Sequence, residues 1–208
     1  MTYAGLLPTP ITDKYSMSLE DDKVRVGVSS MQGWRPTMED AHIVALDLPN
    51  LKGDRRPDEG AMFGVFDGHC GPKIAQVAAS KMIQWVTDRD EFKKGNYNAA
   101  LAKAFIRGDA WMHDEHPTEQ SGCTANVVTM VGNTLLCANA GDSRAILCRA
   151  GRVVELSEDH KPTKKTELER IIRAGGFVSP AGRIFGVLAL SRAMGDYMFK
   201  KNEDLAPE

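Results

Sequence analysis

The residues of this chain best suited to chemistry lie where an apolar stretch ends. The run AMFGVF, residues 61–66, is followed at once by Asp67, Gly68 and His69. A carboxylate at the end of a buried strand needs a cation or several hydrogen-bond donors beside it. Gly68 lets the backbone approach closely, so its carbonyl can turn toward the same cation. Taken alone, however, the tripeptide favours a structural interpretation, in which Asp67 caps the next turn and His69 is a solvated loop residue.

A second acidic loop, GWRPTMEDAH, favours the metal hypothesis. Glu39 and Asp40 enter a predicted strand, and Arg35 lies four residues before Glu39. Carboxylates gathered at strand ends make an oxygen-rich site, which suits Mg²⁺ or Mn²⁺ better than zinc. An arginine beside such a site is suited to bidentate binding of a phosphate, so the two loops together indicate phosphoryl chemistry. The alternative is that Arg35 forms only a structural salt bridge with Glu39 or Asp40.

Other ionisable residues have mainly structural interpretations. Asp142 in NAGDSRA lies in a tight turn between two predicted strands, where aspartate is common. His42 and His160 have no clustered ligands around them, so we expect each to make fixed hydrogen bonds rather than to bind metal. The remaining motif residues are assigned to turns and to the segment after the third helix: Arg144, Arg192 and Asp196.

The composition excludes several classes of protein. The 208 residues are 42% hydrophobic, enough for the core of one domain, or two at most. With 26 basic and 28 acidic residues interspersed, the chain has no basic stripe for nucleic acid and no patch for a membrane surface. We find neither a membrane span nor a secretory signal. Four cysteines without CxxC spacing predict reduced thiols and a cytoplasmic or nuclear location.

The elements that must position these residues begin after an N-terminal arm. Residues 1–22 hold two prolines and no sustained period, which predicts an arm followed by one domain over 23–208. Valine alternates with other residues over 24–30, and 41–48 is rich in β-formers. Two strands therefore flank the acidic loop 31–40.

Strands and helices then follow in groups. Residues 61–66 are apolar on both alternating faces, which is typical of a central strand covered on each side. One helix is predicted to begin at Gly71-Pro72 and a second around residues 101–116. A meander of short strands is predicted over residues 122–156. Thr166 with Glu169 forms a capping-box pattern for a third helix, which ends at Gly175-Gly176. This order predicts an α+β fold with helices outside the sheets.

Seven motifs, in this order and spacing, resemble the type 2C, metal-dependent Ser/Thr protein phosphatase family over about residues 24 to 200. They are SSMQGWRPTMEDAH, VFDGHCG, SGCTANVV, NAGDSRAILCR, EDHKP, ERIIRAGG and LALSRAMGD. The resemblance implies a four-layer αββα sandwich, in which two antiparallel sheets are flanked by helices. It also implies substrates that are proteins phosphorylated on serine or threonine.

The resemblance further implies a site with two or three Mn²⁺ or Mg²⁺ ions. Asp67 would bridge two ions, the Gly68 carbonyl would bind one, and Glu39 and Asp40 would hold metal-bound waters. Asp142 would help to bind a third, weaker ion.

The same resemblance assigns the catalytic roles. Arg35 would bind the phosphoryl oxygens, and His69 would protonate the leaving serine or threonine oxygen as a general acid.

One departure from the family qualifies this prediction. Family members continue past SRAMGD with a strand ending in a further aspartate, and with a later Asp-Asn pair, and neither is found here. We therefore expect the N-terminal two-thirds of a catalytic domain with its C-terminal part missing, and an isolated chain that lacks later metal ligands. Unpaired sheet edges would invite self-association. The alternative function is a non-catalytic fragment that binds phosphoprotein or itself.

Overall fold

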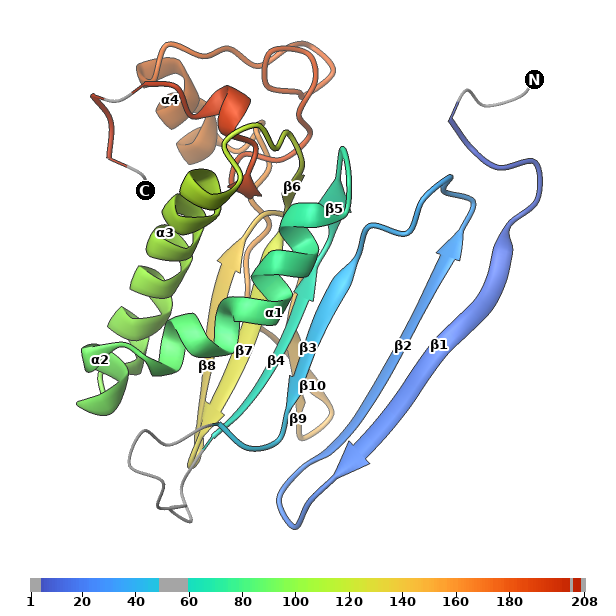
Figure 1. The fold of residues 1–208 in the computed structure, drawn as a ribbon, viewed down its shortest axis with the longest axis vertical. Coiled ribbons are helices and arrows are strands. Elements are labelled where there is room, and N and C mark those ends of the chain that lie inside the picture. The colour runs from blue at the N-terminus through green and yellow to red at the C-terminus, as the bar shows by residue number, and fades with distance from the viewer. Residues whose placement is uncertain (1–4, 49–59, 203, 207–208) are drawn as a thin grey trace.

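A four-stranded antiparallel sheet forms the centre of the molecule. The structure is a computed structural model that describes residues 5–48, 60–202 and 204–206 (Figure 1). The central sheet has the strand order β3-β4-β7-β8. Its strands are β3 (Ala41–Ala45), β4 (Ala61–Phe66), β7 (Ala125–Val131) and β8 (Thr134–Ala140). The apolar run 61–66 is thus an interior strand, as predicted.

Helices cover one face of this sheet (Figure 1). They are α1 (Lys73–Thr87), α2 (Asp90–Lys93) and α3 (Tyr97–Glu115). The two long helices confirm the predicted ones, and their apolar faces bury Ile74, Met82 and Met112 against Met62 and Phe66 of β4. Burial of these side chains is the main stabilising contribution of the layer.

The other face of β4 is partly open, so the prediction of a strand covered on both sides is wrong here. Val65 is 51% exposed. A hairpin contacts the sheet at β3, where the rings of Tyr15 and His42 lie 5.9 Å apart. Within the described chain His42 makes this ring contact rather than the hydrogen bond we expected.

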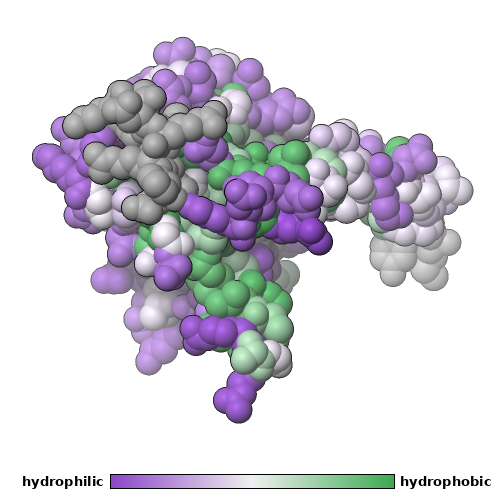
Figure 2. Space-filling model, turned by 90° about the horizontal axis from the view of Figure 1, so that it is seen from below, coloured by the Kyte–Doolittle hydropathy of each residue, from purple (hydrophilic) through white to green (hydrophobic). Residues whose placement is uncertain are grey.

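That hairpin is formed by β1 (Ile11–Glu20) and β2 (Arg25–Gly33), which make a two-stranded sheet of their own. It projects from the rest of the molecule (Figure 2). Residues 11–20 of the predicted N-terminal arm therefore form a strand rather than a loop, and residues 1–4 lie outside the described residues. The missed signal is the alternation of Tyr15, Met17 and Leu19 with serines, which has the period of a strand.

A small second sheet lies at the end of the central one. It has the order β11-β6-β5 and consists of β5 (Gly68–His69), β6 (Gly122–Cys123) and β11 (Met194–Gly195). In its register Gly122 pairs with His69 on one side and with Gly195 on the other. The sheet therefore brings the segment after Asp67 beside a segment more than 120 residues further along the chain.

The predicted meander is confirmed in its strands but not in all of its pairings. After β8 the chain forms a separate hairpin of β9 (Ile146–Arg149) and β10 (Arg152–Glu155), which does not pair with β8. Gly141 has φ 111°, and a Cβ there would lie 2.7 Å from the Thr124 side chain. The chain therefore leaves the sheet at this glycine, which places the turn with Asp142 at a corner.

The third helix, α4 (Lys165–Arg173), ends before Gly175 as predicted, but the capping box is wrong. Lys164 is the N-cap residue and makes no side-chain cap hydrogen bond, so Thr166 lies inside the first turn. The elements together confirm the α+β class. In the described part of the chain, no helix is both long and apolar enough to cross a bilayer.

Candidate functional site

Thr124 joins three segments at one end of the central sheet. The Asp67 N–H donates to Thr124 Oγ1 over 2.9 Å, and the Thr124 N–H donates to the Asp67 carbonyl over 2.9 Å. Thr124 Oγ1 also lies 2.7 Å from Ser143 Oγ, in the turn that carries Asp142. Because Thr124 is fully buried, this link fixes the turn after β8 relative to the end of β4.

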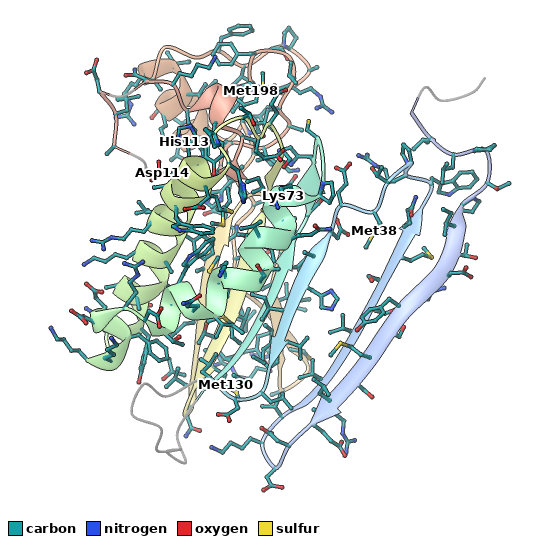
Figure 3. All side chains as sticks on the ribbon, in the orientation of Figure 1. Met38, Lys73, His113, Asp114, Met130 and Met198 are labelled. Carbon is teal, nitrogen blue, oxygen red and sulfur yellow. The ribbon has the colours of Figure 1, made fainter. Side chains whose placement is uncertain are left out.

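The acidic loop packs against Gly68. A Cβ on Gly68 would lie only 2.2 Å from the Glu39 carbonyl oxygen, so only glycine allows this approach. Figure 3 shows Met38, in the same loop, and Lys73, at the start of α1, toward one end of the central sheet and Met130 at the other. The structure therefore brings Glu39 and Asp40 to the end of the sheet where Asp67 and Gly68 lie.

Electrostatics at this end favour a cation. Burial raises the pKa of Asp40, and the charge of Asp67 and a hydrogen bond with Asp67 raise it further, while the Arg35 guanidinium opposes them. Two carboxylates this close repel each other unless a proton or a cation lies between them. The candidate metal ligands at this end are all oxygen atoms, which fits Mg²⁺ or Mn²⁺. Over residues 5–48, 60–202 and 204–206, however, no three His, Cys, Asp or Glu side chains gather closely enough to form a metal site by themselves.

Two expectations about this end are corrected. Asp67 is exposed rather than buried, so the desolvation cost assumed from the sequence does not arise in the described chain. Arg35 is exposed and, among the residues that the structure describes, forms no salt bridge with Glu39 or Asp40. The purely structural interpretation of Arg35 therefore has no ion pair to support it.

Asp142 lies at the corner after β8 with its carboxylate paired to Lys161. The loop that carries Lys161 is held by His160, whose Nδ1 accepts from the Gly141 N–H over 3.1 Å and whose N–H donates to the Gly141 carbonyl. The prediction of a fixed hydrogen bond for His160 is confirmed. The structure thus places Asp142 beside the Thr124 link, with an ammonium group rather than another acid as its partner.

Sequence reasoning missed the partner of His69. Nε2 of His69 lies 2.8 Å from both carboxylate oxygens of Asp196, whose side chain is only 5% exposed. Burial alone would lower the pKa of His69, but the hydrogen bond with Asp196 and the charges of Asp196, Asp67 and Glu39 outweigh it and raise the pKa. A signal did exist, since Asp196 is the single acid in the run AMGDYMF and a buried acid needs a partner.

A buried ion pair anchors the segment that leads to Asp196. Glu167 of α4 accepts from Arg170 at 2.9 Å and from Arg192 at 2.8 and 3.0 Å. Burial would raise the pKa of Glu167, but the hydrogen bonds from Arg192 and Arg170 lower it to about 2. Arg192 therefore does stabilise this segment, as predicted, and Arg144 likewise pairs with Asp159 at 2.9 Å.

Comparisons with known proteins agree on one family. The family model described as Protein phosphatase 2C matches residues 24–207. "Protein phosphatase 2C homolog 2" of Hypocrea jecorina is 48% identical over 206 residues, which cover 97% of this chain and 47% of that protein. "Protein phosphatase 2C homolog 3" of Schizosaccharomyces pombe is 45% identical over 206 residues, covering 97% and 48%. The chain thus spans about half the length of these curated relatives.

Solved structures show the same fold. A phosphatase from Toxoplasma gondii superposes with a TM-score of 0.68 at 26% identity, over 98% of this chain and 70% of that one. A sex determining protein of C. elegans has a TM-score of 0.67 at 24% identity, over 98% and 48%, and so shares the fold alone. These likenesses confirm the predicted fold class. Since the family model spans almost all of the described residues, the chain belongs to the protein phosphatase 2C family.

Proposed function

We propose that this chain is the N-terminal part of a catalytic domain that hydrolyses phosphoserine and phosphothreonine in proteins. The observation that carries the proposal is the meeting of Asp67, Gly68 and Glu39 at one end of the central sheet, where a Cβ on Gly68 would touch the Glu39 carbonyl. Membership of the protein phosphatase 2C family supports the reaction.

The residues at this end would hold two Mn²⁺ or Mg²⁺ ions. Asp67 and the Gly68 carbonyl would bind them directly, Glu39 and Asp40 would bind through water, and Asp142 would assist a third ion if Lys161 released it. When bound, such ions lower the pKa of a coordinated water and offset the charge on phosphoryl oxygens.

Two further residues would act on the substrate itself. The exposed guanidinium of Arg35 is available to bind the phosphoryl oxygens bidentately. His69 would donate a proton to the departing serine or threonine oxygen, since its neighbouring carboxylates favour the protonated imidazole.

The extent and setting of this activity are also proposals. Because the relatives are about twice as long, we expect the 208 residues alone to bind Mn²⁺ more weakly than the relatives do and to hydrolyse phosphopeptides more slowly. All four cysteines are free, which supports the cytoplasm or the nucleus.

The test is Mn²⁺-dependent hydrolysis of a phosphothreonine peptide, with Mn²⁺ binding measured in parallel by calorimetry. Asp67→Asn should abolish hydrolysis and weaken Mn²⁺ binding at least tenfold. The matched control is Asp88→Asn, at the exposed C-cap of α1, which should change neither. Hydrolysis that survives Asp67→Asn would refute the proposed site. Phosphopeptide binding without hydrolysis, in the presence of bound Mn²⁺, would instead support the non-catalytic alternative.

A further inference from the structure

We propose that Asp196 is a positioning residue for His69, which it holds through Nε2 so that Nδ1 is the nitrogen that delivers the proton. This inference rests on the proposed function, in which His69 is the general acid. It adds a residue from the far end of the described chain to that site.

The hydrogen bond fixes which nitrogen is free. Nε2 of His69 lies 2.8 Å from both oxygens of Asp196. An ionised carboxylate only accepts hydrogen bonds, so Nε2 must carry a hydrogen. In the part of the chain that the structure describes, Nδ1 has no hydrogen-bond partner, and it is not among the fully buried atoms that lack one. Nδ1 therefore keeps some accessible surface, and the His69 side chain as a whole is 22% exposed.

The proton transfer then follows with all atoms assigned. Water attacks phosphorus in line, and the bond from phosphorus to the serine or threonine Oγ breaks with its electron pair remaining on Oγ. The Nδ1 proton moves to Oγ, while the attacking water keeps one proton on the new phosphate oxygen and releases the other to solvent, so the products are the free hydroxyl and inorganic phosphate. His69 is left neutral with its hydrogen on Nε2, still donated to the Asp196 carboxylate, and Nδ1 regains its proton from solvent.

The small second sheet is built to hold this pair. Gly195, Gly122 and His69 lie in one row across β11, β6 and β5. A Cβ on Gly122 would lie 2.4 Å from Asp196 Cγ, so the carboxylate reaches His69 across the space that this glycine leaves open.

The backbone of Asp196 is fixed as well. Its φ of 55° is a left-handed conformation that few non-glycine residues adopt. Its N–H donates to the Ser121 carbonyl at 3.2 Å, and the preceding N–H, of Gly195, donates to Asp109 at 2.7 Å. An ordinary ion pair at the protein surface would not require a left-handed residue held by two such backbone hydrogen bonds.

If Asp196 positions His69, the loss of rate in Asp196→Asn should depend on the leaving group of the substrate. Asp196→Asn keeps the shape of the side chain, but its amide group can donate a hydrogen bond to Nε2. The neutral His69 ring then carries its hydrogen on Nδ1 instead of Nε2. The protonated ring also loses the negative charge that Asp196 places beside it. Hydrolysis of a phosphoserine peptide, whose alkoxide must be protonated as it leaves, should fall about 10- to 100-fold. Hydrolysis of p-nitrophenyl phosphate, whose leaving group is stable as an anion, should fall less than about threefold because it needs no general acid.

The matched control is Asp109→Asn, which loosens the same segment without touching His69. It should slow both substrates equally. An equal loss on both substrates for Asp196→Asn would overturn the inference, because a merely structural role affects every substrate alike.

A second readout is independent of turnover. Long-range ¹H–¹⁵N spectra of the His69 ring, recorded with Mg²⁺ on the 208-residue chain, should show the Nε2–H form in the wild type and the Nδ1–H form in Asp196→Asn. An unchanged ring form in the variant would overturn the inference. A wild type without phosphatase activity but with the Nε2–H form would count against the proposed function and not against the positioning of His69.

Discussion

Replacing Glu167 by glutamine should destabilise the fold by about 3 kcal/mol at neutral pH. Glu167 is 4% exposed and accepts hydrogen bonds from Arg170 and Arg192, which lower its pKa from 4.5 to about 2. At about 1.4 kcal/mol for each pKa unit, this difference corresponds to about 3 kcal/mol of folding free energy. Breaking a buried pair by removing one partner typically costs a similar amount.

The sign of the pH dependence follows from the lowered pKa. The ionised carboxylate is favoured in the folded state, so its contribution is complete above pH 4.5 and is lost as the pH falls toward 2. The difference in free energy of unfolding between wild type and Glu167→Gln should therefore be about 3 kcal/mol at pH 7 and about half of that at pH 3. Contributions from acidic groups that do not sense the charge of Glu167 are the same in both proteins and cancel.

Urea unfolding followed by tryptophan fluorescence measures both values. Glu169→Gln is the matched control, because Glu169 lies on the same helix but is exposed, and it should shift stability by less than about 0.5 kcal/mol. A loss below about 1 kcal/mol at pH 7, or a loss of the same size at both pH values, would show that the ion pairs of Glu167 do not supply this stability.

Three further predictions concern packing and burial. Thr124→Val removes the hydroxyl that accepts the Asp67 N–H and should cost about 1–3 kcal/mol in urea unfolding, whereas Thr124→Ser, which keeps the hydroxyl, should cost less. Gly108→Ala should lower the melting temperature despite the better helix propensity of alanine, because its Cβ would lie 2.5 Å from Trp85; a rise would contradict this. Burial raises the pKa of the Cys123 thiol, so Ellman's reagent should modify Cys123 only after denaturation, whereas the exposed Cys70 and Cys148 should react at once. Rapid modification of Cys123 in the native protein would show that it is not buried.

Segments with a strong hydrophobic period were predictable from the sequence. Residues 61–66 form the predicted strand and the first helix buries the predicted apolar face, although exposed Val65 leaves one face of β4 partly open. The strand β1 was missed because it buries no residue, and only its pairing with β2 defines it. The capping box failed because the N-cap residue is Lys164, two residues before Thr166, and Glu167 in the first turn pairs with two arginines instead.

The same difference applies to the site. Asp67 and Glu39 lie next to predicted strands, so the local sequence pattern was enough to identify them as candidate metal ligands. Asp196 is 127 positions from His69, and no local period announces a partner at that distance. The position of Lys161 against Asp142 likewise depends on hydrogen bonds made by its neighbour His160, which a sequence does not display.

The two ends of the segment from Arg192 to Lys200 explain how Asp196 can keep a left-handed backbone. At one end Arg192 is fixed to the buried Glu167, and at the other Lys200 is fixed to Asp109 at 2.7 Å. A strained residue persists where its surroundings determine its conformation, and its strain, of order 1 kcal/mol, is small beside the ion pairs that enclose it. Loss of Glu167 should therefore also loosen the contact between Asp196 and His69. If that contact survived Glu167→Gln unchanged in the His69 ring spectrum, the second sheet and the Asp109 anchor would be sufficient to hold it.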